Sequence, residues 1–226
     1  MGDIMADEFE NYYNKIEVLV NVFTVDKGVL KVLLLRKDDE PYQGYWMLPN
    51  GLLYSNETID NCANDIVYEM TGLRDIKLRQ SNVYSSIDRI PNNRIIADAL
   101  VGLVDSTTVK LENKKSYFEC KWFDINSIPK TVFDHSVVIS DAIDYLKEKI
   151  LKSNVLKGLY PSDFTLPEIQ KLYEQILGKE LDRRNFRKKL LNLDLIEPTG
   201  DKNIGFNGRP AILYKFKDDI DDLKVY

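Results

Sequence analysis

Two short amphipathic segments, separated by a tight turn, constrain the last third of the chain most strongly. Thr165–Glu168 has the spacing of a helix capping box, and apolar residues then recur every three or four positions until Gly178. Asp182 is placed to cap a second helix. The apolar positions of that helix are Phe186, Leu190 and Leu193. A glycine-containing loop and the strand Ala211–Phe216 follow, so the order is that of a winged helix-turn-helix.

The first 150 residues mix strand and helix patterns instead. Strands are predicted at Ile16–Val25, Leu30–Leu35, Ile95–Val104 and Tyr117–Phe123. A helix is predicted over Thr58–Thr71, bounded by Gly72, and a second one precedes Ile150. The class is therefore α/β or α+β, and we expect two domains, residues 1–152 and 153–226.

Charge is distributed unevenly between these two parts. The whole chain has 31 basic and 36 acidic side chains, a net charge of −5, which by itself argues against a nucleic-acid partner. Residues 1–150 hold 17 basic and 24 acidic side chains, however, whereas residues 151–217 hold 13 basic and 8 acidic ones. The positive charge is concentrated in the predicted winged domain.

Composition excludes several classes of protein. Two cysteines and one histidine provide neither a disulfide framework nor a zinc cluster, and we expect no metal and no cofactor. The acidic first ten residues do not have the charge of a signal or transit peptide. The longest apolar stretch is far shorter than the roughly 20 residues of a membrane span. We therefore expect a soluble, cytoplasmic protein that does not bind membranes.

The second predicted helix carries a dense group of DNA-compatible side chains. They are Arg183, Arg184, Asn185, Arg187, Lys188 and Lys189. At 100° per residue, Arg184, Asn185 and Lys188 are expected opposite the apolar face. Arginine and asparagine can read base edges and lysine can contact phosphates. Arg209, in the predicted wing, is a further candidate; the alternative is a solvated basic helix face.

A second motif lies in the N-terminal part. Gly51, Glu57, Val67, Glu69, Gly72 and Leu73 match the Nudix box G-x5-E-x7-R-E-U-x-E-E-x-G-U, in which U is a bulky aliphatic residue. The box departs from the pattern at Asp65, Ile66 and Met70, two of which replace glutamates that hold divalent ions in the hydrolases. One carboxylate holds a hard cation poorly, so we expect catalysis to be lost.

Together with segments such as Ser86–Pro91 and Val132–His135, this box and the basic helix resemble the Nudix-related transcriptional regulators of the NrtR family and the related AraR type. The resemblance implies a Nudix-fold mixed-sheet α/β/α sandwich followed by a winged helix-turn-helix. It also implies a homodimeric repressor that binds a palindromic double-stranded DNA operator. The effector would be ADP-ribose, with NAD-metabolism genes as targets, or L-arabinose or another sugar. An active Nudix hydrolase of ADP-ribose is a further alternative.

The resemblance also suggests which residues lie near an effector. They are Arg36, Trp46, Gly51, Arg89 and Arg94. Arginine can pair with a pyrophosphate and tryptophan can stack on an adenine or a sugar. Each also has a structural explanation, since Trp46 can be a core residue and Arg36 can simply end a strand. Glu57 and Glu69 are expected to be structural, and His135 to cap a helix or form a core hydrogen bond.

Overall fold

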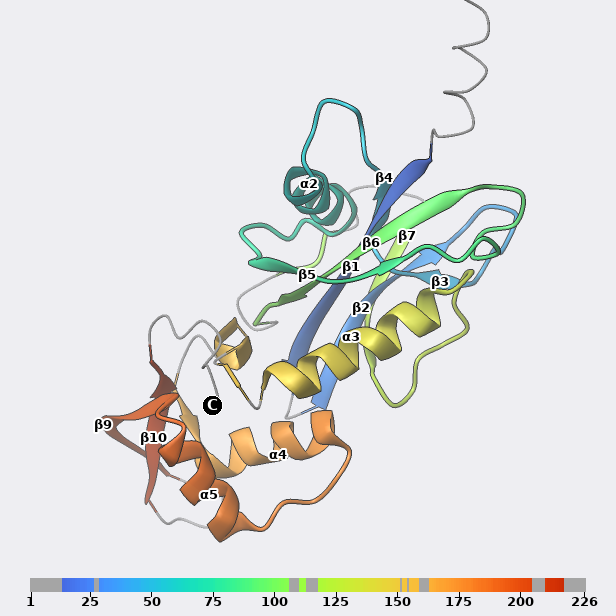
Figure 1. Ribbon diagram of the computed structural model, residues 1–226. Coiled ribbons are helices and arrows are strands. Elements are labelled where there is room, and N and C mark those ends of the chain that lie inside the picture. Colours follow the sequence, from blue (N-terminus) through green and yellow to red (C-terminus); the bar gives the residue numbers. More distant parts are fainter. Residues whose placement is uncertain are drawn as a thin grey trace, which may run out of the picture.

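The computed structural model describes residues 14–26, 29–105, 110–112, 118–150, 152–153, 155–158, 163–204 and 210–217. Their strands form two sheets, one of seven strands and one of three (Figure 1). The larger sheet lies in the N-terminal part and the smaller one in the C-terminal part, beside a pair of helices.

The larger sheet is mixed. Its strands are β1 (Lys15–Asp26), β2 (Val29–Lys37), β3 (Trp46–Met47), β4 (Asn50–Leu52), β5 (Leu78–Tyr84), β6 (Ile95–Leu103) and β7 (Phe118–Asp124). The central order is β3-β2-β1-β6-β5, with β4 paired to β1 and β7 to β2. β1 runs antiparallel to β2 and parallel to β6. The four strands predicted from sequence are present, while β3, β4 and the polar edge strand β5 are additional.

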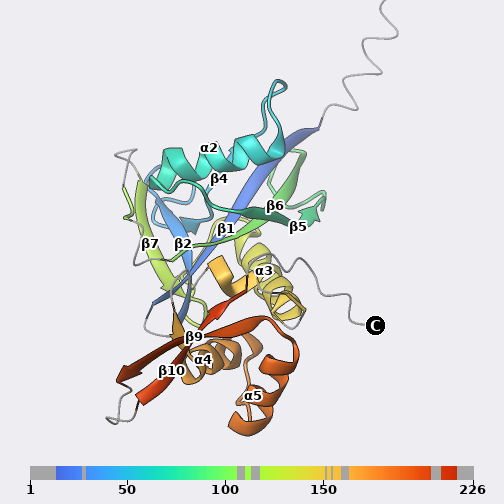
Figure 2. The ribbon, with the colours of Figure 1, turned by 90° about the vertical axis from the view of Figure 1, so that its left-hand side faces the viewer.

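One helix covers each face of this sheet. α2 (Ile59–Thr71) begins at Thr58, whose hydroxyl accepts a hydrogen bond from Asn61 N, and ends at Gly72 with φ 78°. α3 (His135–Lys149) lies on the opposite face (Figure 2). Alternate strand residues therefore point into two apolar clusters, one facing α2 and the other facing α3. The expected mixed-sheet α/β/α sandwich is confirmed.

The C-terminal part has the expected order of elements. A short 3-10 helix, Val155–Gly158, precedes β8 (Phe164–Thr165), α4 (Leu166–Leu177) and α5 (Arg183–Asn192). β9 (Ile196–Ile204) and β10 (Pro210–Phe216) complete a sheet of order β8-β10-β9. The predicted capping box is present, since the Glu168 carboxylate accepts hydrogen bonds from the Thr165 N–H and hydroxyl, each at 2.7 Å.

The two parts share one apolar core. The cluster on the α3 side of the large sheet also includes buried residues of α3, α4 and α5. Leu30 N at the start of β2 donates to Gln175 Oε1 on α4 at 2.9 Å, and Tyr173 Oη donates to Ile150 O at 3.0 Å. The division at residue 152 stays a prediction. No helix in the described part of the chain is long and apolar enough to cross a membrane.

Candidate functional site

α5 is fixed at its start and along one face. Asp182 Oδ1 accepts a hydrogen bond from Asn185 N at 2.8 Å, which caps the helix. Phe186 and Leu190 are 9% and 1% exposed, and the Phe186 ring meets Tyr173 of α4 edge-on at 5.2 Å. These contacts hold the helix against α4, so its other faces are presented to solvent in a defined orientation.

Five cations occupy the exposed surface of α5. Arg183, Arg184, Arg187, Lys188 and Lys189 are all exposed. Within the part of the chain that the structure describes, none of the five forms an ion pair with a carboxylate. A short helix with this much uncompensated positive charge suits an anionic partner, and its width suits a major groove.

Two members of the set lie away from the expected face. Asn185 and Lys189 line a pocket between α4 and α5, together with Phe186 and Leu190. The helix geometry explains this, since Asn185 precedes Phe186 by 100° and Lys189 follows it by three residues. Arg184 and Lys188 remain on the side opposite Phe186, and the expectation that Asn185 lies there with them is wrong.

The wing is described only in part. Arg209 lies outside the described residues, so its role stays a prediction. Lys202 is exposed on β9, in the same hairpin. It was not in the sequence-based set, although a cation beside a glycine-containing loop after a predicted recognition helix is a usable signal.

Arg36 and Trp46 lie together near one edge of the large sheet. They are directly paired in the register of β2 and β3. The Arg36 side chain is 48% exposed and its Nη1 lies 3.5 Å from the Glu119 carboxylate, which also pairs with Lys121. The Trp46 ring is half-buried and packs edge-on against Phe123 at 4.4 Å. Both residues keep an accessible surface, as an effector contact requires.

Arg89 has a different environment. Its side chain is 1% exposed; Nη1 donates to Glu17 of β1 at 2.9 Å, and Nε and Nη2 donate to Asp134 at 2.9 and 3.0 Å. Burial raises the pKa of Glu17 above its ordinary value, although the Arg89 bond opposes this shift. A guanidinium held this way joins the 85–94 loop to β1 and to the start of α3. We assign Arg89 a structural position, because so little of it is exposed to a ligand.

Arg94 and Gly51 occupy separate places. Arg94 is exposed, and its Nη1 donates to the carbonyl oxygens of Ser85 and Ser86 at 2.8 and 3.2 Å, which closes the 85–94 loop. Gly51 lies in β4, where an added Cβ would meet the Ile66 side chain at 3.0 Å. The structure therefore brings only Arg36 and Trp46 of the five effector candidates into direct neighbourhood.

The residues of the Nudix box lie on and before α2. Glu57 Oε1 accepts from Tyr54 N at 2.7 Å, and Glu69 is exposed. Ile66 and Met70 pack against the apolar cluster between α2 and the sheet. No group of three or more His, Cys, Asp or Glu side chains among the described residues has the arrangement of a metal site. At two box positions where the hydrolases have glutamates, this chain therefore has apolar side chains that pack toward the sheet.

His135 forms a core hydrogen bond, as predicted. It is the first residue of α3 and is 1% exposed, and its Nδ1 accepts a hydrogen bond from Leu48 N at 3.0 Å. Burial lowers its pKa from 6.5 to about 4. The imidazole is therefore neutral at physiological pH and joins α3 to the segment between β3 and β4.

Comparison with known proteins identifies the architecture. Residues 148–216 match the family model of the NrtR DNA-binding winged helix domain. The crystal structure of Shewanella oneidensis NrtR complexed with a 27mer DNA matches with a TM-score of 0.77 and 27% identity, over 92% of this chain and 99% of that one. This chain has the architecture of the NrtR regulators. The resemblance that the sequence motifs indicated is thereby confirmed.

Two curated relatives and one further structure add detail. The ADPR responsive transcriptional repressor NtrR of Acinetobacter baylyi is 29% identical over 199 residues, which cover 86% of this chain and 79% of the relative. An ADP-ribose pyrophosphatase of Methanocaldococcus jannaschii is 32% identical over 111 residues, 49% of this chain and 64% of that enzyme. The NUDIX domain of Shewanella NrtR, crystallised with ADP ribose, shares the fold of the large sheet, with a TM-score of 0.54 and 21% identity.

Proposed function

We propose that this chain is a transcriptional repressor of the NrtR type that binds operator DNA through α5 and responds to ADP-ribose. The observation that carries the proposal is the exposed, uncompensated cationic surface of α5 within a winged helix domain of the NrtR family. The ADP-ribose response of the Acinetobacter relative supports the effector. The alternative effector, L-arabinose, has no such support among these relatives.

A repressor of this kind is proposed to act as a homodimer on a palindromic operator. Two recognition helices must then lie about 34–36 Å apart to enter successive major grooves. An effector can regulate binding only if it has different affinities for the arrangements that do and do not meet this spacing. We propose that ADP-ribose favours the arrangement that releases DNA, with NAD-metabolism genes as the targets.

The experiment is a DNA-binding titration with the region upstream of the chain's own gene and of neighbouring NAD-metabolism genes. Nanomolar, sequence-specific binding that weakens as ADP-ribose is added, and does not respond to L-arabinose, is the expected result. Arg184→Ala and Arg187→Ala should each weaken specific binding about tenfold, the effect of losing one base or phosphate contact. The matched control is Lys171→Ala, an exposed cation on α4. Unchanged affinity in both arginine variants contradicts the assignment of α5.

We further propose that the Nudix domain has lost hydrolase activity. The support is the packing of Ile66 and Met70 in the apolar cluster, where the hydrolase pattern has glutamates. The similarity to an ADP-ribose pyrophosphatase keeps hydrolysis as the second candidate function. A Mg²⁺-dependent turnover assay with ADP-ribose separates the two: no product above background is expected, and robust hydrolysis contradicts the proposal.

A further inference from the structure

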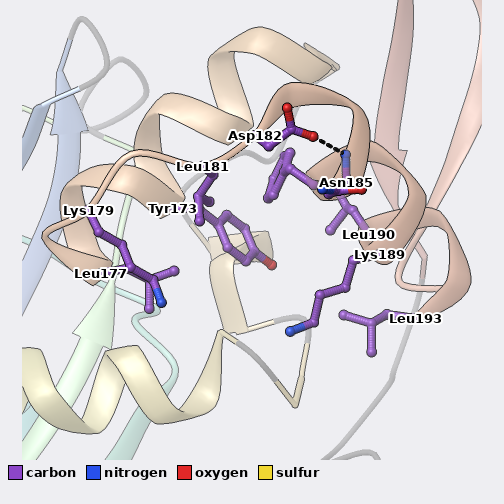
Figure 3. A pocket seen from close by; sticks show the side chains of 10 residues that line it. Tyr173, Leu177, Lys179, Leu181, Asp182, Asn185, Lys189, Leu190 and Leu193 are labelled. Carbon is purple, nitrogen blue, oxygen red and sulfur yellow. Dashed lines mark hydrogen bonds between the residues drawn. The ribbon is translucent and has the colours of Figure 1, made fainter.

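A pocket with a largely apolar lining lies between the two helices of the winged domain, behind α5, and is open to solvent on one side. Its volume is about 240 Å³. The apolar lining comes from α4, from the turn after it and from α5 (Figure 3): Tyr173, Leu177, Leu181, Phe186, Leu190 and Leu193. A sealed apolar cavity of about 150 Å³ holds benzene, so a pocket of this volume has room for one ring and a substituent.

Some polar side chains around the cavity are hydrogen-bonded within the chain, whereas two lysines have no carboxylate partner among the described residues. Asp182 Oδ1 is bonded to Asn185 N, and Tyr173 Oη is bonded to Ile150 O. Lys179 and Lys189 are exposed and reach the pocket from opposite ends, one on either side of Tyr173 (Figure 3). Neither lysine pairs with a carboxylate in the described part of the chain. The pocket is therefore apolar inside, and its rim carries two lysines and one carboxylate, Asp182, so that the rim has a net positive charge.

We propose that this pocket binds a small organic acid, a monocyclic aromatic or short aliphatic carboxylate, as a second ligand of the chain. The ring or alkyl group fills the space between α4 and α5, and the carboxylate pairs with Lys189 or Lys179 in a charge-assisted hydrogen bond. ADP-ribose, with a purine, two riboses and a pyrophosphate, is too large for this volume. The site is thus distinct from the one at which the nucleotide is proposed to act.

Such a ligand is placed to influence DNA binding, and this step rests on the proposed function. Phe186 and Leu190 are the residues through which α5 packs on α4, and both line the pocket. Lys189 is also one of the five exposed cations of α5, although it lies at the pocket rather than opposite Phe186. A bound carboxylate neutralises part of the positive charge on Lys189, which weakens binding to phosphates.

The first measurement is ligand binding to the full chain in the absence of DNA, monitored by ligand-observed NMR. The probes are benzoate and its neutral counterpart, benzyl alcohol. Saturable benzoate binding is expected. The double variant Lys179→Gln/Lys189→Gln should lower the affinity for benzoate about tenfold and the affinity for benzyl alcohol less than about twofold. Lys171→Gln on α4 is the matched charge control. Equal losses for both probes, or no loss for benzoate, overturn the proposal.

A second pair of variants tests the location. Leu193 is half-buried and lines the pocket, whereas Leu191 is 37% exposed and does not. Leu193→Trp should abolish benzoate binding by filling the space, and Leu191→Trp should leave it unchanged. Binding that survives Leu193→Trp places the ligand elsewhere. Benzoate binding that appears only after deletion of residues 218–226 would assign the pocket to that acidic segment and overturn the proposal.

A final experiment measures operator binding with and without benzoate, and it distinguishes failure of the pocket from failure of the proposed function. If α5 binds DNA, benzoate should weaken operator binding of the wild type and leave that of Leu193→Trp unaffected. Benzoate binding to a chain that binds no DNA would refute the repressor function but preserve the pocket. Operator binding by a chain that does not bind benzoate would refute the pocket but preserve the repressor function.

Discussion

At the scale of single residues, His135 couples stability to pH. Its imidazole has a pKa of about 4 in the folded chain and 6.5 as the unperturbed value. Between these values the unfolded state takes up a proton and the folded state does not, so stability falls as pH decreases from 6.5 to 4. The loss amounts to about 3 kcal/mol at most. Above pH 6.5 both states are neutral and the effect disappears.

The variant that tests this coupling is His135→Asn, whose amide oxygen can replace Nδ1 as the acceptor for Leu48 N. Urea unfolding at a series of pH values should show a steeper loss of stability for the wild type than for the variant between pH 6.5 and 4. Parallel profiles would mean that His135 titrates normally in the folded chain. Measurements at pH 8 provide the control, since there the two slopes should agree.

Arg89 offers a second prediction at this scale. Replacing it by Met removes the partner of two carboxylates, Glu17 and Asp134, of which Glu17 is almost fully buried. The cost is expected to be about 3–5 kcal/mol, because uncompensated charge is left in a poorly solvated place. The triple variant that also carries Glu17→Gln and Asp134→Asn should regain most of that stability. If Arg89→Met unfolds at the same urea concentration as the wild type, the structural assignment is wrong.

At the scale of the element, α5 is a short helix whose exposed positive charge should govern the DNA contacts proposed for it. Each phosphate contact releases condensed counterions, so the salt dependence of binding counts the contacts. Lys188→Gln should lower the magnitude of the slope of log affinity against log salt by about 1, with a similar loss of affinity on specific and random DNA. Arg184→Ala should instead weaken specific DNA more than random DNA. A Lys188 variant with an unchanged slope would remove that residue from the phosphate-contacting surface.

Elements also show what the sequence could and could not predict. Caps and periodicity are local, so α2, α4 and α5 were predicted nearly to their ends. Thr165 and Asp182 were predicted as N-caps, whereas Thr58, predicted as the first helical residue, is the N-cap of α2. β5 was missed because Leu78–Tyr84 is an edge strand with few buried side chains and no apolar alternation. The ion pairs of Arg89 were not predicted for a related reason. Its partners lie 72 and 45 residues away, and no local pattern reports an ion pair at that separation.

At the scale of the molecule, local sequence patterns also failed to report the contacts between the two parts of the chain. Composition and charge separate an acidic N-terminal part from a basic C-terminal part, but they do not show that Leu30 N of β2 donates a hydrogen bond to Gln175 of α4, 145 residues away. This bond and the shared apolar cluster fix α4 against the large sheet. A structural change in the sheet can therefore be transmitted to α5 through packing contacts with α4, on which α5 packs through Phe186 against Tyr173. The coupling that a ligand-responsive repressor needs is available without a hinge.

A continuous core predicts that the chain unfolds as one unit. Both tryptophans, Trp46 and Trp122, belong to the large sheet, so their fluorescence reports the N-terminal part alone. Ile176 lies on α4 and is fully buried in the shared cluster. Ile176→Ala should lower the free energy of unfolding by about 2–5 kcal/mol, through lost apolar contact and the cavity left behind. The tryptophan transition and the far-UV circular dichroism transition should shift together to lower urea, whereas Leu191→Ala, at an exposed site on α5, should move neither by much.

Were the two parts independent, Ile176→Ala would shift only a fraction of the circular dichroism signal, and the tryptophan midpoint would stay in place. That result would require effector signals to cross a flexible joint, because a rigid core would then be excluded.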